Sequence, residues 1–350
     1  MTGLAQRLTP PGSVPYPGNH LGLRWRPMIG RDAPAVYALI CLIEDEDQAI
    51  RRTSVEDIAD MMEGKNGRDW VDTIVGLDAK ANICAVASVR VLRGIHEAAT
   101  AVVSAFIHPH WRGRGVGRAL LYWQDSRARQ MLVETFGAES DVPVSISNLV
   151  DAHMTDRRRL YIAAGFFAKR IYRVMYRDLA GGEVAPQARH GYRIVPWNQV
   201  PQDQIRAIHM EAFQQAFRSP LRALWWDDAM NHFDPRWSFV AVDSAGEVVG
   251  YAMTGRPAQR WVATGRPEAY IYLLGVAEAH RGQSVASALV GNAVAEASAS
   301  GASRIGLDVD MSSPDRAHSI YEHLGFVDEA ADGRPSRRPV GAFRAHGGPG

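Results

Sequence analysis

The sequence predicts a mixed α/β protein made of two tandem copies of one domain, each with a central sheet flanked by helices. The chain has 350 residues, which is enough for two domains of ordinary size. Short motifs recur once along it, in the same order. Between these motifs, apolar segments of strand length alternate with segments of helical periodicity, which is typical of helices packed on a sheet.

The repeat is clearest around two glycine-containing motifs. Arg112-Gly113 recurs as Arg281-Gly282, 169 positions later, and Gly165-Phe166 recurs as Gly325-Phe326, 160 positions later. The second copy is therefore shorter than the first between these two motifs. A single repeat of this length indicates a duplicated domain rather than a solenoid.

The repeat and the local composition predict five segments. We expect a flexible N-terminal arm at 1–20, a first domain at 21–179 and a second domain at 191–329. Residues 180–190 are polar and contain glycine, which predicts a linker. The tail at 330–350 is rich in Gly, Pro and Arg, which predicts disorder.

Each copy has the same expected order of elements: a strand, a helix, three strands, a helix, a strand, a helix that contains a tyrosine, and a last strand. In the first copy the named strands are 23–26, 72–76, 83–91, 101–107 and 142–146, and the helices are 33–43, 116–130 and one ending near Tyr161. In the second copy the strands are 192–195, 238–242, 248–254, 270–276 and 304–309, and the helices are 202–217, 285–299 and one ending near Tyr321.

Composition excludes several classes of protein. The hydrophobic fraction is 46%, the charged fraction 22% and the formal net charge +1, so neither nucleic acid nor an anionic membrane is an expected partner. Cys41 and Cys84 make no disulfide framework and no paired metal motif, which favours a reducing compartment. Residues 1–20 lack the apolar core of a signal peptide, and no apolar run is long enough to span a bilayer. A cytoplasmic protein is expected, as a monomer or a homodimer.

The strongest local signal follows the strand that ends at Ile107. His108-Pro109 breaks the strand, a basic glycine loop runs from Arg112 to Gly117, and a helix begins there. Glycines let backbone N–H groups approach a ligand, and a helix N-terminus favours anions, so the loop predicts a pyrophosphate cradle. A plain structural turn is the competing interpretation. The loop lacks Gly-Lys-Ser/Thr and the dinucleotide spacing of glycines, so two other phosphate loops are excluded.

This loop, Arg112-x-x-Gly115-x-Gly117, resembles the acyl-CoA-binding signature of the Gcn5-related N-acetyltransferases (GNAT). A later tyrosine followed by Gly-Phe, as in Tyr161 with Gly165-Phe166, is also typical of that family. The resemblance covers both copies and extends to tandem GNAT proteins of the mycothiol synthase type. It implies acetyl-CoA as co-substrate, without a metal, and a strand that separates from its neighbour to admit pantetheine. The implied CoA-binding residues are Ile107, Arg112, Gly113, Arg114, Gly115, Val116, Gly117, Arg118, Val276, Arg281, Gly282, Gln283, Ser284, Val285 and Ala286.

The two copies depart from the family pattern in opposite ways. In the second loop Ser284 stands where glycine is expected, and Gln283 replaces a positive charge. The second copy, however, has the more typical tyrosine helix, with a small residue, Ala317, four positions before Tyr321. The loop thus favours the first copy as the CoA binder, whereas the tyrosine favours the second as the catalyst.

Transfer of an acetyl group to an amine needs a base, an oxyanion donor and a proton for the thiolate. The resemblance implies Tyr321, and Tyr161 in the first copy, as the general acid. Family members often carry a carboxylate at the positions held here by Tyr270 and Ala101. Glu268 lies two residues before Tyr270 and would share its strand face, so it is the candidate base. A solvated carboxylate at a strand start is the alternative for Glu268, and core packing is the alternative for the tyrosines.

The acceptor site is expected near the first helices of a unit. Residues 44–47 form an acidic run that could attract a cationic amine, although such runs are usually solvated helix ends. In the second copy, aromatic residues with nearby carboxylates suit an amine with an apolar body, with core packing as the alternative for most of the aromatics; the set is Phe213, Phe217, Trp225, Trp226, Asp227 and Asp228. No histidine spacing indicates a metal site.

Two functions remain open at this point. The first is an N-acetyltransferase (EC 2.3.1.-) that moves an acetyl group from acetyl-CoA to a primary amine of a small molecule or peptide. The second is a degenerate tandem GNAT protein that binds acyl-CoA without catalysis, as a sensor or a scaffold.

Overall fold

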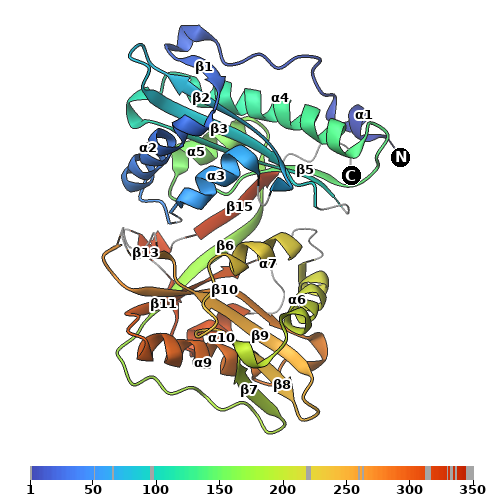
Figure 1. Cartoon of the computed structure of the whole chain (residues 1–350), viewed down its shortest axis with the longest axis vertical. Coiled ribbons are helices and arrows are strands. Elements are labelled where there is room, and N and C mark those ends of the chain that lie inside the picture. The colour runs from blue at the N-terminus through green and yellow to red at the C-terminus, as the bar shows by residue number, and fades with distance from the viewer. Residues whose placement is uncertain are drawn as a thin grey trace. The chain divides into compact units, whose positions relative to one another are not determined.

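The structure is a computed structural model of the whole chain. It describes residues 2–50, 52–64, 67–94, 98–217, 222–258, 261, 264–311, 317–328, 330–331, 334–335 and 337–343. The chain divides into two compact units, one of residues 1–169 with 339–350 and the other of residues 170–338. Each unit is a mixed sheet between helices, as the sequence predicts (Figure 1).

The first unit has a five-stranded sheet in the order β1-β2-β3-β4-β5. Its strands are β1 (Arg24–Pro27), β2 (Trp70–Leu77), β3 (Ile83–Val91), β4 (Ala99–Ile107) and β5 (Val144–Ser147). Neighbouring strands are antiparallel except for β4 and β5, which are parallel. A long crossover through helix α4 (Val116–Phe136) makes this parallel pair possible.

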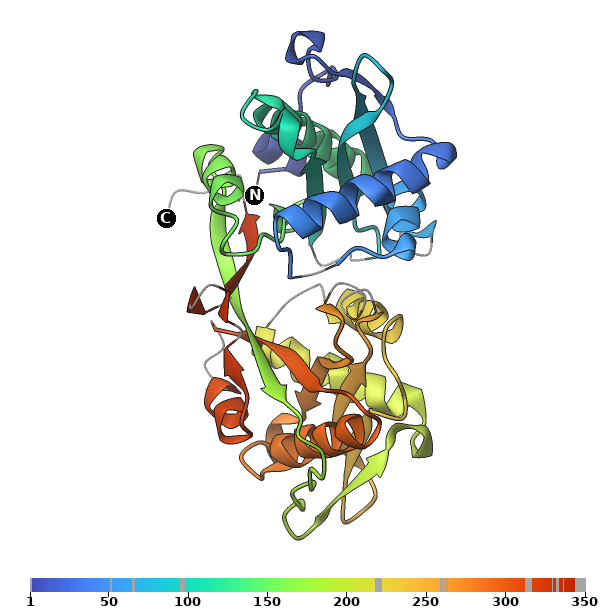
Figure 2. The same cartoon turned by 90° about the vertical axis from the view of Figure 1, so that its left-hand side faces the viewer.

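Two cores cover the two faces of this sheet. Along β2, Ile74 packs in the cluster of α4 while Val75 packs in the cluster of α2 (Ala33–Glu46) and α3 (Val55–Glu63). This alternation is the period-two pattern of a strand buried on both faces. Figure 2 shows α2 and α3 in front of the first sheet and α4 behind it.

The N-terminal arm is more ordered than the sequence predicts. Residues 4–8 form helix α1 (Leu4–Leu8), in which Leu4 and Leu8 are fully buried in the core beside α4. The backbone N–H of Ala5 also donates to the carbonyl of Ala138. Two leucines four residues apart share one helix face, and their burial there stabilises the arm.

The second unit has strands β7 (Tyr192–Pro196), β8 (Phe239–Asp243), β9 (Val248–Gly255), β10 (Glu268–Val276) and β11 (Arg304–Asp310). Helices α6 (Gln202–Phe217) and α7 (Arg222–Met230) cover one face, where Phe213 and Trp226 pack on Tyr251 and Met253. Helix α9 (Val285–Ala299) covers the other face. The tyrosine helix α10 (Ala317–His323) follows β11.

Strand β6 (Phe167–Asp178) decides where the units divide. It follows helix α5 (Thr155–Ala163) of the first copy, but residues 172–178 pair with β11 of the second unit. The division therefore falls at Arg170 and not in the expected linker at 180–190. The paired residues of β6 and β11 lie about 130 positions apart in the sequence, and pairing over such a distance has no signature in local composition. The sequence therefore predicts the domain boundary in the polar linker, after β6.

The C-terminal tail also differs from the expected disorder where it is described. Strand β12 (Val327–Asp328) and strand β15 (Arg337–Phe343) both pair with β6, and β13 (Ala330–Ala331) pairs with β14 (Arg334–Pro335). An edge strand offers unpaired N–H and C=O groups, and these segments satisfy some of them on β6. The other tail residues lie outside the described residues.

Candidate active site

The two parallel strand pairs separate at the same relative place. Ladder pairs between the described residues of β4 and β5 end at Val102↔Ser147, although β4 continues to Ile107. Pairs between β10 and β11 end at Ile271↔Leu307, although β10 continues to Val276. In each unit the strand thus leaves its partner just before the glycine loop, as the family resemblance implies.

The loop itself has the backbone of an anion cradle. Gly113 and Gly115 adopt φ of 73° and 85°, in the left-handed region, and α4 begins directly after them. These conformations turn successive N–H groups toward one side, and a helix N-terminus adds its own unpaired N–H groups. At Gly117 an added Cβ would lie 3.2 Å from Leu160 Cδ2, so the first turn of α4 touches the tyrosine helix α5.

The first arginine of each loop donates a hydrogen bond to the last residue of the strand that precedes it. Arg112 Nε donates to the carbonyl of Ile107 at 3.1 Å, and Arg281 Nε donates to the carbonyl of Val276 at 3.2 Å. The same contact in both units fixes the angle between strand and loop. Of the other basic residues, Arg114 and Arg118 are exposed, and the Arg114 guanidinium lies 5.0 Å from the ring centre of Trp111.

In the second loop, Gly282 and Ser284 adopt φ of 74° and 63°. Ser284 therefore has the left-handed conformation that Gly115 has in the first loop, and it stands directly before α9. A non-glycine residue in this region carries a steric cost of about 1–2 kcal/mol. Ser284 thus keeps the backbone shape of the cradle, with backbone strain at this residue.

Replacing Ser284 by Gly is expected to stabilise the protein, because the left-handed backbone strain disappears. The gain should be about 0.5–1 kcal/mol, since glycine also adds freedom to the unfolded chain. Urea unfolding followed by circular dichroism measures it, with Ser300→Gly, at the other end of α9 where φ is −84°, as the control that should not stabilise. A urea midpoint of unfolding for Ser284→Gly that is equal to or lower than that of the native protein would contradict the strain argument.

The acidic run at 44–47 is engaged inside the first unit. Asp47 binds both Arg112 amino groups, at 2.6 and 3.0 Å, and lies 3.5 Å from Arg157. Glu44 is buried and accepts hydrogen bonds from the backbone and side chain of Thr53, and its burial raises its pKa. These contacts hold the end of α2 against the loop, so they support a structural role for the run rather than capture of an amine.

The two tyrosines differ in their surroundings. Tyr161 is 5% exposed, and its hydroxyl accepts a hydrogen bond from the Asn148 side chain. Tyr321 is half-buried, and no hydrogen bond links its hydroxyl to another residue that the structure describes. Among the described residues, the Tyr161 hydroxyl thus has a hydrogen-bond partner and the Tyr321 hydroxyl has none.

Burial raises the pKa of both candidate acids. The pKa of Tyr321 rises to about 12, so its hydroxyl is protonated throughout the physiological range. Burial also raises the pKa of Tyr161, against the opposing effect of its Asn148 hydrogen bond. A protonated phenol can donate to a departing thiolate, which suits the predicted role of Tyr321.

These raised pKa values predict loss of stability in alkali. Burial raises the pKa of Tyr321 and Tyr172 to about 12 and that of Tyr251 well above 10, so the folded chain holds protons that the unfolded chain releases above its pKa of 10.0. The contribution of these three tyrosines to the free energy of unfolding is complete below pH 10 and falls as the pH rises toward 12. Thermal unfolding from pH 8 to 11.5 should show Tm falling above pH 10, together with the tyrosinate absorbance. A Tm that is constant to pH 11.5 would be inconsistent with these shifts.

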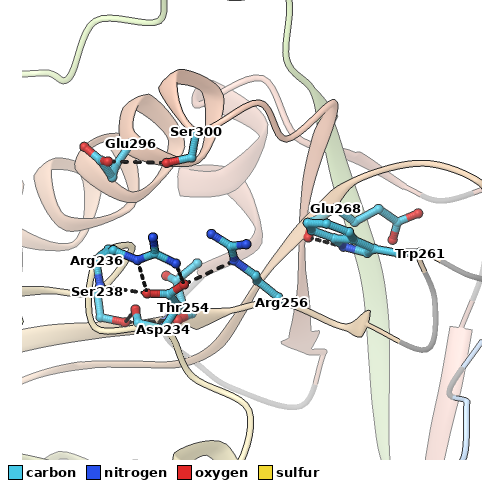
Figure 3. Close-up of polar contacts among 9 residues, drawn as sticks. All are labelled: Asp234, Arg236, Ser238, Thr254, Arg256, Trp261, Glu268, Glu296 and Ser300. Carbon is cyan, nitrogen blue, oxygen red and sulfur yellow. Dashed lines mark hydrogen bonds and ion pairs between the residues drawn. The ribbon is translucent and has the colours of Figure 1, made fainter.

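Glu268 is fully buried at the start of β10. Its carboxylate accepts from Arg304 at 2.6 Å and from Thr264 at 3.1 Å. Its carbonyl accepts from the indole of Trp261, which Figure 3 shows beside the Arg256–Asp234 ion pair. Because Arg304 and Thr264 both bind the Glu268 carboxylate, this arrangement favours a structural ion pair, and the catalytic role of Glu268 stays a prediction.

The structure adds one feature that the sequence analysis did not find. The β9–β10 register shifts between Ile271 and Leu273, which makes Tyr272 the extra residue of a β-bulge. Tyr272 and Leu273 accordingly both pack toward the α6–α7 core. A bulged residue has no place in the regular ladder and bends the strand locally. The β3–β4 register of the first unit runs without a shift from Ala85 to Val91.

Two kinds of site are not found in the described part of the chain. No group of three or more His, Cys, Asp or Glu side chains there could hold a metal ion. Among the described helices, none is both long enough and apolar enough to cross a membrane.

Part of the chain matches a known protein family. Residues 202–326 match the model of the acetyltransferase (GNAT) family. A GCN5-related N-acetyltransferase from Sphaerobacter thermophilus is similar over 92% of this chain and 95% of its own, with 23% identity and a TM-score of 0.67. No curated protein matches the sequence.

Two further solved structures have the same fold. One is a tandem GNAT protein from the clavulanic acid biosynthesis pathway, with 17% identity over 94% of this chain and all of its own and a TM-score of 0.62. The other is Saccharomyces cerevisiae N-myristoyltransferase with bound myristoyl-CoA, with 11% identity, coverage of 93% and 79% and a TM-score of 0.56.

The comparisons show a shared fold and a family match over part of the chain. Residues 202–326, in the second unit, match the acetyltransferase (GNAT) family model, and the chain as a whole has the two-unit fold of the solved structures named above. Enzymes of the GNAT family use acyl-CoA. A closer relation to mycothiol synthase stays a prediction.

Proposed function

We propose that the protein transfers an acetyl group from acetyl-CoA to the primary amine of a small molecule or peptide, and that the second unit is the catalytic one. Two observations together support this choice: the separated strand β10 has a bulge at Tyr272, and the Tyr321 hydroxyl has no hydrogen-bond partner among the described residues. In the first unit the strand has no bulge, and the tyrosine hydroxyl is bound to Asn148.

The residues present fit an acyl-CoA. Gly282 and Ser284 have the left-handed backbone that turns N–H groups outward, and Ser284 can also donate its hydroxyl to a phosphate. Residues 273–276 of β10 lie beyond the last pair with β11, where their backbone groups can bind the amides of pantetheine. The first unit has the same features with two glycines and more positive charge, so it fits a second acyl-CoA.

In this mechanism the protein mainly positions the two reactants and stabilises charge. The bulge N–H on β10 donates to the oxygen of the thioester carbonyl as negative charge develops there. The amine nitrogen forms a bond to the carbonyl carbon, and the carbon–sulfur bond breaks. Tyr321 gives its proton to the departing sulfur and regains one from the nitrogen. Placing the amine next to the thioester contributes most of the rate increase.

A non-catalytic acyl-CoA sensor or scaffold is the second candidate. Two observations favour it: Ser284 strains the second loop, and Glu268 is bound in an ion pair with Arg304. Under this proposal both units bind acyl-CoA and neither turns it over.

The test is a calorimetric titration with acetyl-CoA, followed by turnover assays against a panel of primary amines, including tyramine, cadaverine, glucosamine and a peptide with a free N-terminus. We expect binding of acetyl-CoA and release of CoA with at least one amine. Binding without turnover of any amine supports the sensor. Absence of binding contradicts both candidates.

A further inference from the structure

The second glycine loop lacks two positive charges that the first loop has. Arg114 and Arg118 correspond, 169 positions later, to Gln283 and Ser287. The first arginine is kept as Arg281, but its Nε donates to the backbone carbonyl at the end of β10. A phosphate at the second loop therefore meets backbone N–H groups and hydroxyls but, apart from Arg281, no cationic side chain of the loop itself.

The segment between β6 and β7 (Figure 1) contacts both α9 and this loop. Pro186 lies against α9 at Gly291, where an added Cβ would clash with the Pro186 ring. Three residues later, Arg189 Nη1 donates to the side-chain oxygen of Gln283 at 3.5 Å. The linker predicted at 180–190 is thus held to the second unit, and its arginine lies beside the glycine loop.

A further contact fixes the place where this segment enters the sheet. The Tyr192 hydroxyl and Nδ1 of His280 are 3.0 Å apart, and the two rings meet edge to face with their centres 5.7 Å apart. His280 belongs to the short 3-10 helix η6 (Glu278–His280), which leads directly into the loop. Arg189 therefore lies between two residues, Pro186 and Tyr192, that are both in contact with the loop or its helix.

Arg189 has no carboxylate partner among the residues that the structure describes. Its side chain is exposed, and the group that it contacts is the neutral amide of Gln283. The acidic residue of the same linker, Glu183, binds Arg177 instead. Within the described part of the chain, the charge of Arg189 is thus not neutralised, so the guanidinium can bind an anion at the loop.

The first unit has no arginine at the matching place. With the same spacing of 169, Arg189 corresponds to His20. The His20 ring lies back against Gly18, where an added Cβ would clash with it. In that unit the loop has an exposed cation of its own, Arg114. The two units thus place a guanidinium beside the glycine loop in different ways, one from the loop and the other from the linker.

We propose that Arg189 binds a phosphate group of acyl-CoA at the second glycine loop, in place of the loop arginine that this unit lacks. The inference rests on the binding of acyl-CoA by the second unit, which is part of the proposed function. A guanidinium offers several N–H donors to phosphate oxygens and stays charged at every physiological pH. The pyrophosphate and the 3′-phosphate of CoA share this chemistry, and the test separates them.

The test compares Arg189→Gln and Arg189→Lys with Arg266→Gln. The control removes the same charge from an exposed arginine just before β10, at the opposite end of that strand from the loop. Calorimetry with acetyl-CoA measures the binding, and Ser284→Glu identifies the event that belongs to the second loop. Arg189→Gln should weaken that event about 10-fold, because a charge-assisted contact is lost. Arg189→Lys should keep most of the affinity, and Arg266→Gln should match the native protein.

Two analogues identify the phosphate. With 3′-dephospho-acetyl-CoA, the loss of affinity in Arg189→Gln should persist if the contact is to the pyrophosphate and disappear if it is to the 3′-phosphate. S-acetylpantetheine has no phosphate, so its kcat/KM should be the same in Arg189→Gln and the native protein. Added salt should narrow the difference in acetyl-CoA affinity, because an exposed charge is screened.

Three results overturn the inference and leave the proposed function intact where turnover continues. They are equal acetyl-CoA affinity of Arg189→Gln and the native protein, an equal loss of affinity in Arg266→Gln, and an equal loss with S-acetylpantetheine.

A loss of affinity in Arg189→Gln, with no turnover of any amine by the native protein, has the opposite meaning. In that case the phosphate contact stands and the proposed acetyl transfer fails. Absence of acetyl-CoA binding at the second loop of the native protein contradicts both. Thermal unfolding of each variant verifies that it is folded, which an exposed position favours.

Discussion

Replacing Tyr321 by Phe is expected to lower kcat about 10²-fold, because the thiolate then departs without a proton from the enzyme. The ring and its packing stay, since Phe keeps the T-shaped contact with Phe326 at 6.1 Å between ring centres. The KM for acetyl-CoA should change little, because the hydroxyl acts on the departing sulfur and not on the bound pyrophosphate. Steady-state kinetics with the amine that turns over fastest measure kcat and the KM for acetyl-CoA separately.

The matched control is Tyr161→Phe in the first unit. It removes the same hydroxyl from the same motif, but there the hydroxyl accepts from Asn148. We expect kcat close to that of the native protein and a loss of about 1 kcal/mol in the free energy of unfolding, because Asn148 loses its partner. The opposite result, with kcat lost in Tyr161→Phe and kept in Tyr321→Phe, would place catalysis in the first unit.

Replacing Ser284 by Glu is expected to abolish catalysis by removing acetyl-CoA from the second cradle. A carboxylate about 4 Å from a phosphate costs about 4 kcal/mol at the effective dielectric of a protein surface, which corresponds to about a 10³-fold loss of affinity. The position stands directly before α9, where the helix N-terminus otherwise favours an anionic ligand. Calorimetry with acetyl-CoA and turnover assays measure the two effects separately.

Ser284→Gln is the control for size and backbone strain, because it places a neutral side chain of the same length in the same left-handed conformation. It should lose far less affinity than Ser284→Glu. Gly115→Glu in the first unit should remove one binding event from the titration and leave turnover intact. Turnover that survives Ser284→Glu and disappears in Gly115→Glu would assign catalysis to the first cradle.

Several features of the site could be predicted from the sequence because they are local. The glycine loop follows an apolar strand and starts a helix in both copies, and the structure has those elements at those places. The substitution at Ser284 was visible as a departure from the glycine pattern. Its left-handed conformation could not be read from the sequence, because serine seldom adopts it without the constraint of a surrounding fold.

Other features depend on which segments meet. The acidic run at 44–47 appears as a solvated patch in the sequence, yet Asp47 binds Arg112, 65 positions later. Glu268 appears as a strand-start carboxylate, yet it pairs with Arg304 on the next strand of the sheet. In both cases the arginine partner is far away in the sequence, so no local pattern predicts that the carboxylate is part of an ion pair.

The duplicated α/β architecture could be predicted from the sequence, together with the two glycine loops and the paired tyrosine motifs, because periodicity and glycine spacing are properties of short segments. The folded structure adds that β6 completes the second sheet, and that β10 has a bulge at Tyr272 where the β3–β4 pairing of the first unit has none. Those features follow from strand register, and register is set by pairing between distant segments.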